Sequence, residues 1–272
     1  LVGVGHPLNS DSDPQDMEVS GVHQTFPLFP YALASWSESS PMNPEEVGGY
    51  AEGDILMPPQ EARNGIKEET FRWPNGHIPY VIEGRFNQEQ RDTIMKAIAD
   101  YHRLTCLRFV PYNGQKDYIT IQSKNSGCWS SVGRIGGRQE VNLQVPGCVT
   151  KKGTVLHEIL HAVGFMHEQS RPERDDFVSI KYNNIKPGTE NNFKKADPKH
   201  TNSFNIPYDY NSVMHYSAYA FSRNNQKTIE PKVINYAFIF SFLGFLVLKS
   251  QSCLRKANVM LMCFFIERAW KC

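Results

Sequence analysis

Three histidines and one glutamate stand close together in the sequence, at spacings that suit metal-dependent hydrolysis. His157 and His161 are four residues apart, so on a helix their imidazoles project from one face and can share a metal ion. Glu158 can then act on a water held at that metal without binding the metal itself. Gly164 permits a backbone conformation that ends the helix, which lets the chain bring His167 back as a third ligand. Three protein ligands leave one position open for water, as in a catalytic zinc site.

Zinc is the metal that this ligand set favours. Three imidazoles with a neighbouring carboxylate suit a redox-silent Lewis acid better than copper or iron, although the sequence alone leaves other metals open. The alternative is an amphipathic helix with ordinary polar histidines, and the glycine and third histidine at fixed offsets argue against it. Glu158 is therefore predicted to be the general base, which takes a proton from the attacking water and passes it to the leaving amine.

A second motif follows downstream, where residues 207–216 read PYDYNSVMHY. Together with HEILHAVGFMHEQSRPERD at 157–175, it resembles the astacin family of metzincin metalloendopeptidases, which carry HExxHxxGxxHExxRxDRD and then an SxMHY turn. Glu173 stands where the family usually has aspartate, and the charge is kept. The resemblance implies that Met214 is an apolar floor beneath the metal. It also implies that Tyr216 is a detachable fifth ligand that donates to the oxyanion. A plain core methionine and a buried tyrosine are the alternatives.

Residues 1–63 are predicted to form a prosegment. They are rich in Pro, Ser, Asp and Glu with little periodicity, and composition alone also fits a disordered leader without a role. Prosegments of the astacin family carry an FxGD-type motif whose aspartate caps the zinc. The sequence AEGDI at 51–55 resembles this motif, with Ala51 in place of the usual aromatic residue. Asp54 is therefore predicted to be a metal ligand in the zymogen only.

The resemblance also predicts the activation site. A trypsin-like protease would cut between Arg63 and Asn64, because the residues that follow are similar to the start of the mature family enzymes. In the family, the new α-amino group pairs with the glutamate after the third histidine, which is Glu168 here. A buried carboxylate needs a cationic partner, and cleavage would create one. The alternative is that Glu168 is a surface charge.

The cysteines indicate where the protein works. Six cysteines favour an oxidising compartment, and with it a secreted, extracellular protein. The resemblance pairs Cys128 with Cys148, and it implies a further disulfide at Cys106 whose partner is open. Three downstream cysteines are the candidates: Cys253, Cys263 and Cys272.

The net charge of +1 gives no strong field for nucleic acid or a membrane surface. The expected partners are therefore a protein or peptide substrate and an activating trypsin-like protease, with no nucleic acid, and a membrane is not favoured as a partner. The oligomeric state is left open.

The elements that must position these side chains indicate an α+β fold. Apolar spacing and an N-capping Asn87 with Gln90 predict a helix ending at Leu104. Four segments have strand character: 77–82, 107–110, 118–122 and 141–145. With the resemblance, they imply a two-lobed zincin (metzincin) catalytic domain over 64–232 that is incomplete at its C-terminal end. This domain would have a small twisted, mostly N-terminal sheet, an active-site helix at the cleft, and an irregular C-terminal lobe. An extended substrate is expected along an edge strand near 128–133.

The resemblance stops after Lys232, and residues 233–272 are predicted to be a hydrophobic and basic tail. Its apolar run is shorter than the roughly twenty residues of a membrane span. We interpret the tail as an alternative or mispredicted final exon, with a buried helix and a marginal anchor as the other interpretations. The first functional hypothesis is a secreted zinc-dependent endopeptidase made as a zymogen. The second is an inactive truncated or splice-variant product that at most binds peptides or prosegments.

Overall fold

The computed structural model describes residue 33 and residues 36–56, 69–199 and 201–232. The predicted cut between Arg63 and Asn64 and the predicted tail at 233–272 lie outside the described residues. The three candidate partners of Cys106 also lie outside the described residues. Cys106 itself is disulfide-bonded. No helix in the described ranges combines the length and the apolar character that a membrane crossing requires.

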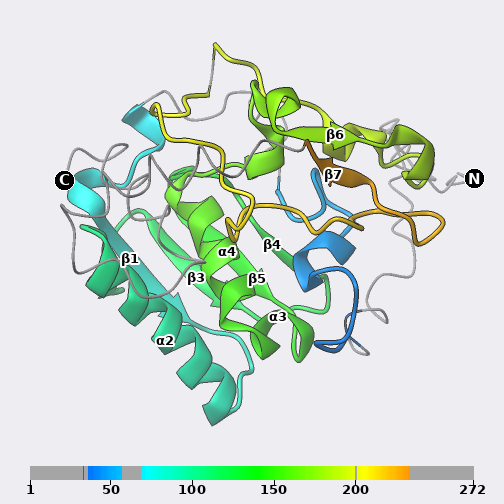
Figure 1. Ribbon diagram of the computed structural model, residues 1–272. Helices are drawn as coiled ribbons and strands as arrows, with labels where there is room; N and C mark the ends of the chain where they lie inside the picture. The colour runs from blue at the N-terminus through cyan, green and yellow to red at the C-terminus, as the bar shows by residue number, and fades with distance from the viewer. Residues whose placement is uncertain (1–32, 34–35, 57–68, 200, 233–272) are drawn as a thin grey trace, which may run out of the picture.

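A five-stranded sheet underlies the predicted active-site helix, in the order β2-β1-β3-β5-β4 (Figure 1). Its first four strands in this order pair in parallel, whereas β4 pairs antiparallel with β5 and forms one edge. The strands are β1 (His77–Ile82), β2 (Arg108–Pro111), β3 (Tyr118–Gln122), β4 (Cys128–Ser130) and β5 (Arg138–Leu143). The edge position of β4 agrees with the strand predicted to receive substrate.

The bounds of β1 and β3 are those predicted, but the prediction for β5 was wrong at both ends. The strand begins at the polar residue Arg138, which pairs with Tyr118 of β3. The strand ends before Gln144, whose backbone N–H donates to the carbonyl oxygen of Gly127 at 3.3 Å. Sequence reasoning followed the apolar residues, whereas the register with β3 determines the strand.

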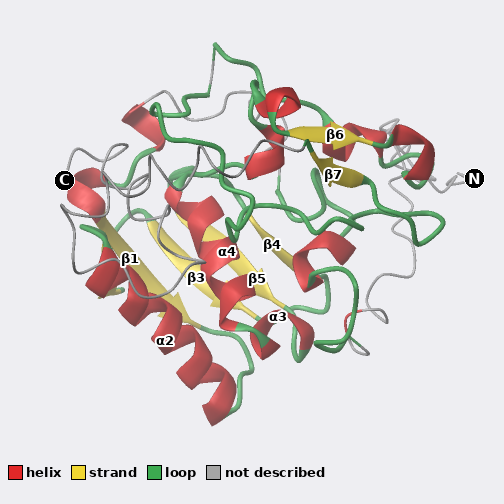
Figure 2. Ribbon diagram, in the orientation of Figure 1, coloured by secondary structure: helices red, strands yellow, loops and turns green. Residues whose placement is uncertain are grey.

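Two helices lie on one face of the sheet, in front of it in Figure 2. Helix α2 (Gln88–Leu104) begins at Asn87, which forms the predicted capping box with Gln90. Its buried residues are Ile94, Ala97, Ile98 and Tyr101. These residues belong to the same hydrophobic core as α4 (Lys152–Val163). The short α3 (Gly147–Thr150) precedes α4.

The C-terminal part has its own small core and little regular structure. Strands β6 (Val178–Ile180) and β7 (Ile229–Pro231) pair antiparallel beside this second core. The 3-10 helices are η1 (Pro44–Val47), η2 (Glu69–Phe71), η3 (Pro74–Gly76), η4 (Glu168–Ser170), η5 (Arg174–Asp176), η6 (Tyr182–Asn184) and η7 (Glu190–Phe193). Met214 lies in the first core and Tyr216 in the second. The α+β prediction is confirmed, with two cores joined at the predicted Met-turn.

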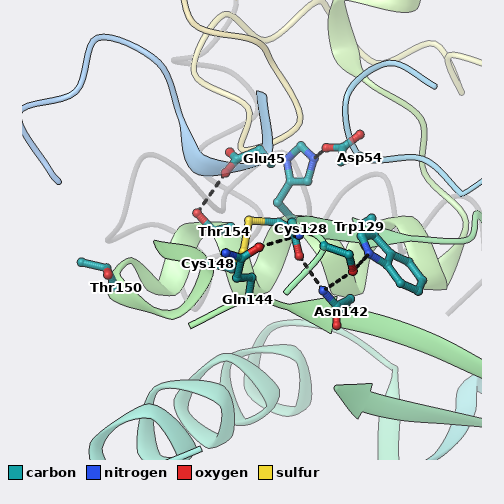
Figure 3. The surroundings of a disulfide bond; sticks show 12 residues. Glu45, Asp54, Cys128, Trp129, Asn142, Gln144, Cys148, Thr150 and Thr154 are labelled. Carbon is teal, nitrogen blue, oxygen red and sulfur yellow. Dashed lines mark hydrogen bonds and ion pairs between the residues drawn. A yellow bond between two sulfur atoms is a disulfide. The ribbon is translucent and has the colours of Figure 1, made fainter. Parts of the chain in front are cut away.

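The predicted disulfide between Cys128 and Cys148 is present, and it ties the start of β4 to α3 (Figure 3). Two buried amides hold the adjoining turn. Asn142 Nδ2 donates to the carbonyl oxygen of Gly127 at 2.6 Å, and Gln144 Oε1 accepts from the N–H of Gly127 at 2.8 Å. These contacts hold the start of the edge strand independently of the segment that pairs with it.

Candidate metal centre

Helix α4 presents the first two predicted ligands and is held by buried hydrogen bonds. Tyr101 of α2 donates its hydroxyl to the carbonyl oxygen of Leu156 at 2.7 Å. Trp73 donates its indole N–H to the carbonyl oxygen of Ala162 at 2.8 Å. The helix ends as predicted at Gly164, whose φ of 128° lies in the region that favours glycine. The chain then turns and returns to His167.

The Nδ1 atom of each histidine faces an acceptor. His157 Nδ1 lies 2.6 Å from the carbonyl oxygen of Val213, and His161 Nδ1 lies 2.8 Å from that of Phe165. Carbonyl oxygens only accept hydrogen bonds, so each of these Nδ1 atoms carries the proton. His167 Nδ1 lies 2.7 Å from a carboxylate oxygen of Glu52. The neutral rings therefore direct Nε2 lone pairs toward one another.

The Nε2 atoms converge on one point together with Asp54. His157 Nε2 lies 3.1 Å from His161 Nε2 and 3.3 Å from His167 Nε2. Asp54 Oδ2 lies 2.8, 3.6 and 3.2 Å from the Nε2 atoms of His157, His161 and His167, respectively. Four tetrahedral ligands at the usual zinc distances are separated by about 3.3–3.4 Å. The four groups can therefore hold one zinc ion.

The chemistry of this donor set also requires a cation. The lone pairs of the three histidine Nε2 atoms meet the carboxylate of Asp54, which is fully buried. The second oxygen of Asp54, Oδ1, has no hydrogen-bond partner within the described residues. Burial opposes the charge on Asp54, and without a metal ion its pKa is held well below the usual value only if His167 and His161 are protonated. A buried anion facing three nitrogen donors fits a metal ion.

Glu158 lies next to this group but is not part of it. Its side chain is fully buried, and neither carboxylate oxygen has a hydrogen-bond partner among the residues the structure describes. Burial raises the pKa of Glu158 well above its ordinary value, and the charges of Asp54 and Glu45 raise it further. A carboxylate with a raised pKa and two unused oxygens is suited to accept a proton.

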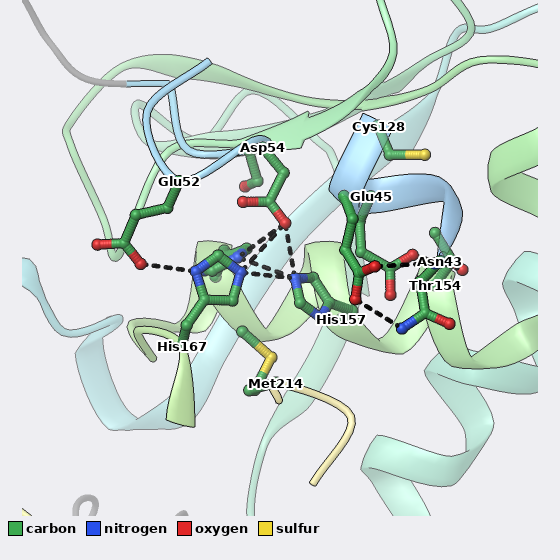
Figure 4. A network of polar contacts seen from close by, with 12 residues as sticks. Asn43, Glu45, Glu52, Asp54, Cys128, Thr154, His157, His167 and Met214 are labelled. Carbon is green, nitrogen blue, oxygen red and sulfur yellow. Dashed lines mark hydrogen bonds and ion pairs between the residues drawn. The ribbon is translucent and has the colours of Figure 1, made fainter. Parts of the chain in front are cut away.

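The Met-turn contributes an apolar floor and a hydroxyl. Met214 is buried, and Figure 4 shows it beneath His157 and His167. The ring of Tyr216 packs on His167 with centroids 4.8 Å apart. Its hydroxyl donates to the backbone carbonyl of Glu52. Tyr216 thus lies at the site, with its hydroxyl held by the predicted prosegment.

Glu168 is buried, which excludes the alternative of a surface charge. Its Oε1 accepts from Arg171 Nη1 at 2.8 Å and from the backbone N–H of Asp209 at 2.8 Å. Burial raises the pKa of Glu168, and the charge of Arg171 opposes this effect. A cavity of about 100 Å³, lined by Glu168, Arg171 and Arg72 among others, lies beside it.

The predicted prosegment covers the site by adding to the edge of the sheet. Ile55 forms a parallel bridge with Ser130 of β4. The N–H of Ser130 donates to the carbonyl oxygen of Asp54, and the N–H of Leu56 donates to that of Ser130, both at 2.9 Å. The segment therefore occupies the edge that was predicted to receive substrate, and it aims Asp54 at the histidines (Figure 4).

Three glutamates upstream of Asp54 take part in this cover, and sequence reasoning missed all of them. Glu45 accepts from Thr154 Oγ1 of α4 at 3.0 Å. Glu46 accepts from the Ser217 N–H and, at 2.7 Å, from the Ser217 hydroxyl. Glu52 accepts from His167. The one local signal was Asn43 before a Pro-Glu-Glu sequence, which fits a capped helical turn but does not indicate burial.

Comparison with known proteins gives a consistent result. The peptidase family described as Astacin matches residues 65–261, which extends beyond Lys232. Zinc metalloproteinase nas-4 of Caenorhabditis elegans is 40% identical over 197 residues, covering 68% of this chain and 62% of that protein. Human meprin A subunit beta is 43% identical over 186 residues, covering 68% of this chain and 26% of that protein. The chain thus spans only part of the length of these relatives.

A solved structure shows the same fold. High choriolytic enzyme 1, a hatching enzyme zinc-protease from the medaka Oryzias latipes, superposes with a TM-score of 0.60 at 32% identity, covering 80% of this chain and all of that one. The family match covers most of the sequence and contains the three converging histidines and the Met-turn. With the zinc-binding geometry, these similarities establish that the chain belongs to the astacin family of zinc metalloendopeptidases.

Proposed function

We propose that this chain is a secreted endopeptidase that hydrolyses protein substrates and is made as a zymogen. One observation carries the proposal: three histidine Nε2 atoms converge beside the unpaired carboxylate of Glu158. The family match and the resemblance to a hatching enzyme zinc-protease support it. The disulfide-bonded cysteines support an extracellular location.

In the proposed reaction, His157, His161 and His167 hold the zinc ion. When bound, zinc lowers the pKa of a water ligand toward neutrality and polarises a carbonyl group. Glu158 accepts the proton of the attacking water and delivers it to the leaving amine. Tyr216 donates its hydroxyl to the developing oxyanion once the carbonyl of Glu52 has been removed. The free edge of β4 binds an extended substrate by backbone hydrogen bonds.

Latency follows from the position of the prosegment. Asp54 would take the coordination position that water needs, the carbonyl of Glu52 accepts from the hydroxyl of Tyr216, and residues 54–56 pair with β4. Cleavage by a trypsin-like protease between Arg63 and Asn64 would release all three contacts. The new α-amino group would then compete with Arg171 for Glu168, which is buried and already pairs with a cation. The inactive-product hypothesis is not favoured, because the three histidines, Glu158 and Tyr216 meet at one site among the described residues.

Zinc removal tests the proposed function. The full chain is secreted from cells, treated with trypsin, and assayed for casein hydrolysis after dialysis against 1,10-phenanthroline. We expect hydrolysis to disappear with the metal and to return when zinc is added in stoichiometric amounts. Trypsin is removed with a specific inhibitor before the assay. Hydrolysis that survives metal removal, or that never appears, would contradict the proposal.

A second prediction concerns the anchor at Glu46, which is buried between Asn43 and Ser217. Burial raises its pKa to about 7, and the bond from the Ser217 N–H opposes this rise. Replacing Glu46 with alanine should lower the free energy of unfolding of the uncut chain by about 1–3 kcal/mol, because the donors around it lose their acceptor. Urea unfolding measures the change. The exposed Glu38→Ala is the matched control and should leave the midpoint unchanged.

A further inference from the structure

Glu52 is the third acceptor in the ring of hydrogen bonds that orients the zinc ligands. The Nδ1 atoms of His157 and His161 face backbone carbonyls of the catalytic region. The Nδ1 atom of His167 instead faces Glu52 Oε2 at 2.7 Å, and the Ser170 hydroxyl donates to the same oxygen at 2.7 Å. The acceptor for His167 therefore comes from the segment that activation would remove.

The backbone at Glu52 is held in a conformation that is unfavourable for a residue with a side chain. Its φ is +50°, in the left-handed region, and the next residue is Gly53. This conformation costs a non-glycine residue about 1–2 kcal/mol. The N–H of Glu52 donates to Asn192 Oδ1 at 3.2 Å, which helps to hold it. Glycine at this position would relieve the backbone but would leave His167 without its carboxylate.

From these contacts we infer that Glu52 is a positioning residue for the metal centre, which fixes the ring of His167 through Nδ1 and strengthens zinc retention by the zymogen. The carboxylate accepts the Nδ1 proton and so keeps the Nε2 lone pair directed at the metal. It also makes the imidazole a more basic ligand. The prosegment then acts on the zinc twice, directly through Asp54 and indirectly through Glu52.

Two features separate this role from simple docking of the prosegment. Glu45 is a buried prosegment glutamate that binds Thr154 and not a histidine Nδ1. Replacing Glu45 loosens the prosegment while leaving the orientation of His167 intact. Asp54 contacts the Nε2 side of the histidines, opposite to the side that Glu52 contacts. The contributions of Glu45, Glu52 and Asp54 to zinc binding can therefore be measured separately.

The inference rests on the proposed zinc site and zymogen, and its test does not depend on peptidase activity. The zinc dissociation constant of the full uncut chain is measured by competition with a chromophoric chelator. We expect Glu52→Gln to weaken zinc binding about 10–100-fold, the usual effect of losing such a partner. Glu52→Ala, which removes the acceptor completely, should weaken it at least as much. Glu45→Gln should leave it unchanged.

Cobalt substitution gives a second readout. The visible absorption of the Co²⁺-loaded uncut chain reports the geometry of its ligands, and we expect it to change in Glu52→Gln but not in Glu45→Gln. Zinc affinity and a cobalt spectrum that stay as in the wild type for both Glu52 variants would overturn the inference. So would an equal loss in Glu45→Gln, which would assign the effect to docking. Failure of the proposed function is distinct, since it would show as missing casein hydrolysis whatever the zinc affinity.

Discussion

Replacing Glu158 with glutamine is expected to lower casein hydrolysis by the activated chain about 10²–10⁴-fold, the usual contribution of a general base. Glutamine has the same size and shape, but it cannot take a proton from water. Both carboxylate oxygens of Glu158 are free of hydrogen bonds to the described residues, so the substitution disturbs no structural contact among them. The initial rate after trypsin treatment is the measurement.

Zinc content provides the control for this experiment. Glu158 is not among the four groups whose ligand atoms converge, so Glu158→Gln should bind zinc as the wild type does. A variant that loses its zinc would show that Glu158 has a structural role instead. A variant with zinc and nearly full activity would show that another group moves the proton.

The second large effect is expected at Asp54. Replacing it with asparagine should give the uncut chain casein hydrolysis at least about tenfold above the wild-type background. The reason is that losing a buried charged contact costs about 1.5–3 kcal/mol, and 1.4 kcal/mol is a factor of ten. Asparagine keeps the shape of the turn but removes the anionic ligand that faces the three histidines. The backbone pairing of residues 54–56 with β4 remains, so latency is reduced and not abolished.

The uncut state must be verified by the mass of the chain during the assay. The matched control is the double variant Asp54→Asn with Glu158→Gln, in which the gained activity should vanish. If the single variant stays fully latent, Asp54 is not the switch, and the backbone pairing and the contact of Glu52 with Tyr216 would be sufficient for latency.

The catalytic side of the site was predictable because its geometry is local. The interval between His157 and His161 places both on one face of a helix, and Gly164 supplies the turn to His167. The capping box of α2 and the bounds of β1 and β3 follow from equally short-range patterns. In each of these cases a few neighbouring residues decide the structure.

The contacts of the predicted prosegment join distant parts of the chain. Glu52 meets His167 across 115 positions, and Glu46 meets Ser217 across 171. No local pattern distinguishes a buried glutamate that binds such a partner from an exposed one in a polar segment. The resemblance identified Asp54 because its motif is known, whereas the neighbouring glutamates became visible only in the folded structure.

The pairing of Ile55 with Ser130 also affects the tendency of the uncut chain to aggregate. An edge strand with free backbone groups can recruit a strand from another molecule and start aggregation. In the uncut chain, the backbone groups of Ser130 pair with a covalently attached segment, whose effective concentration exceeds that of any neighbouring molecule. Removal of this segment would uncover the edge for an extended protein substrate. In the proposed zymogen, the segment that covers the metal site would thus also protect the chain from self-association.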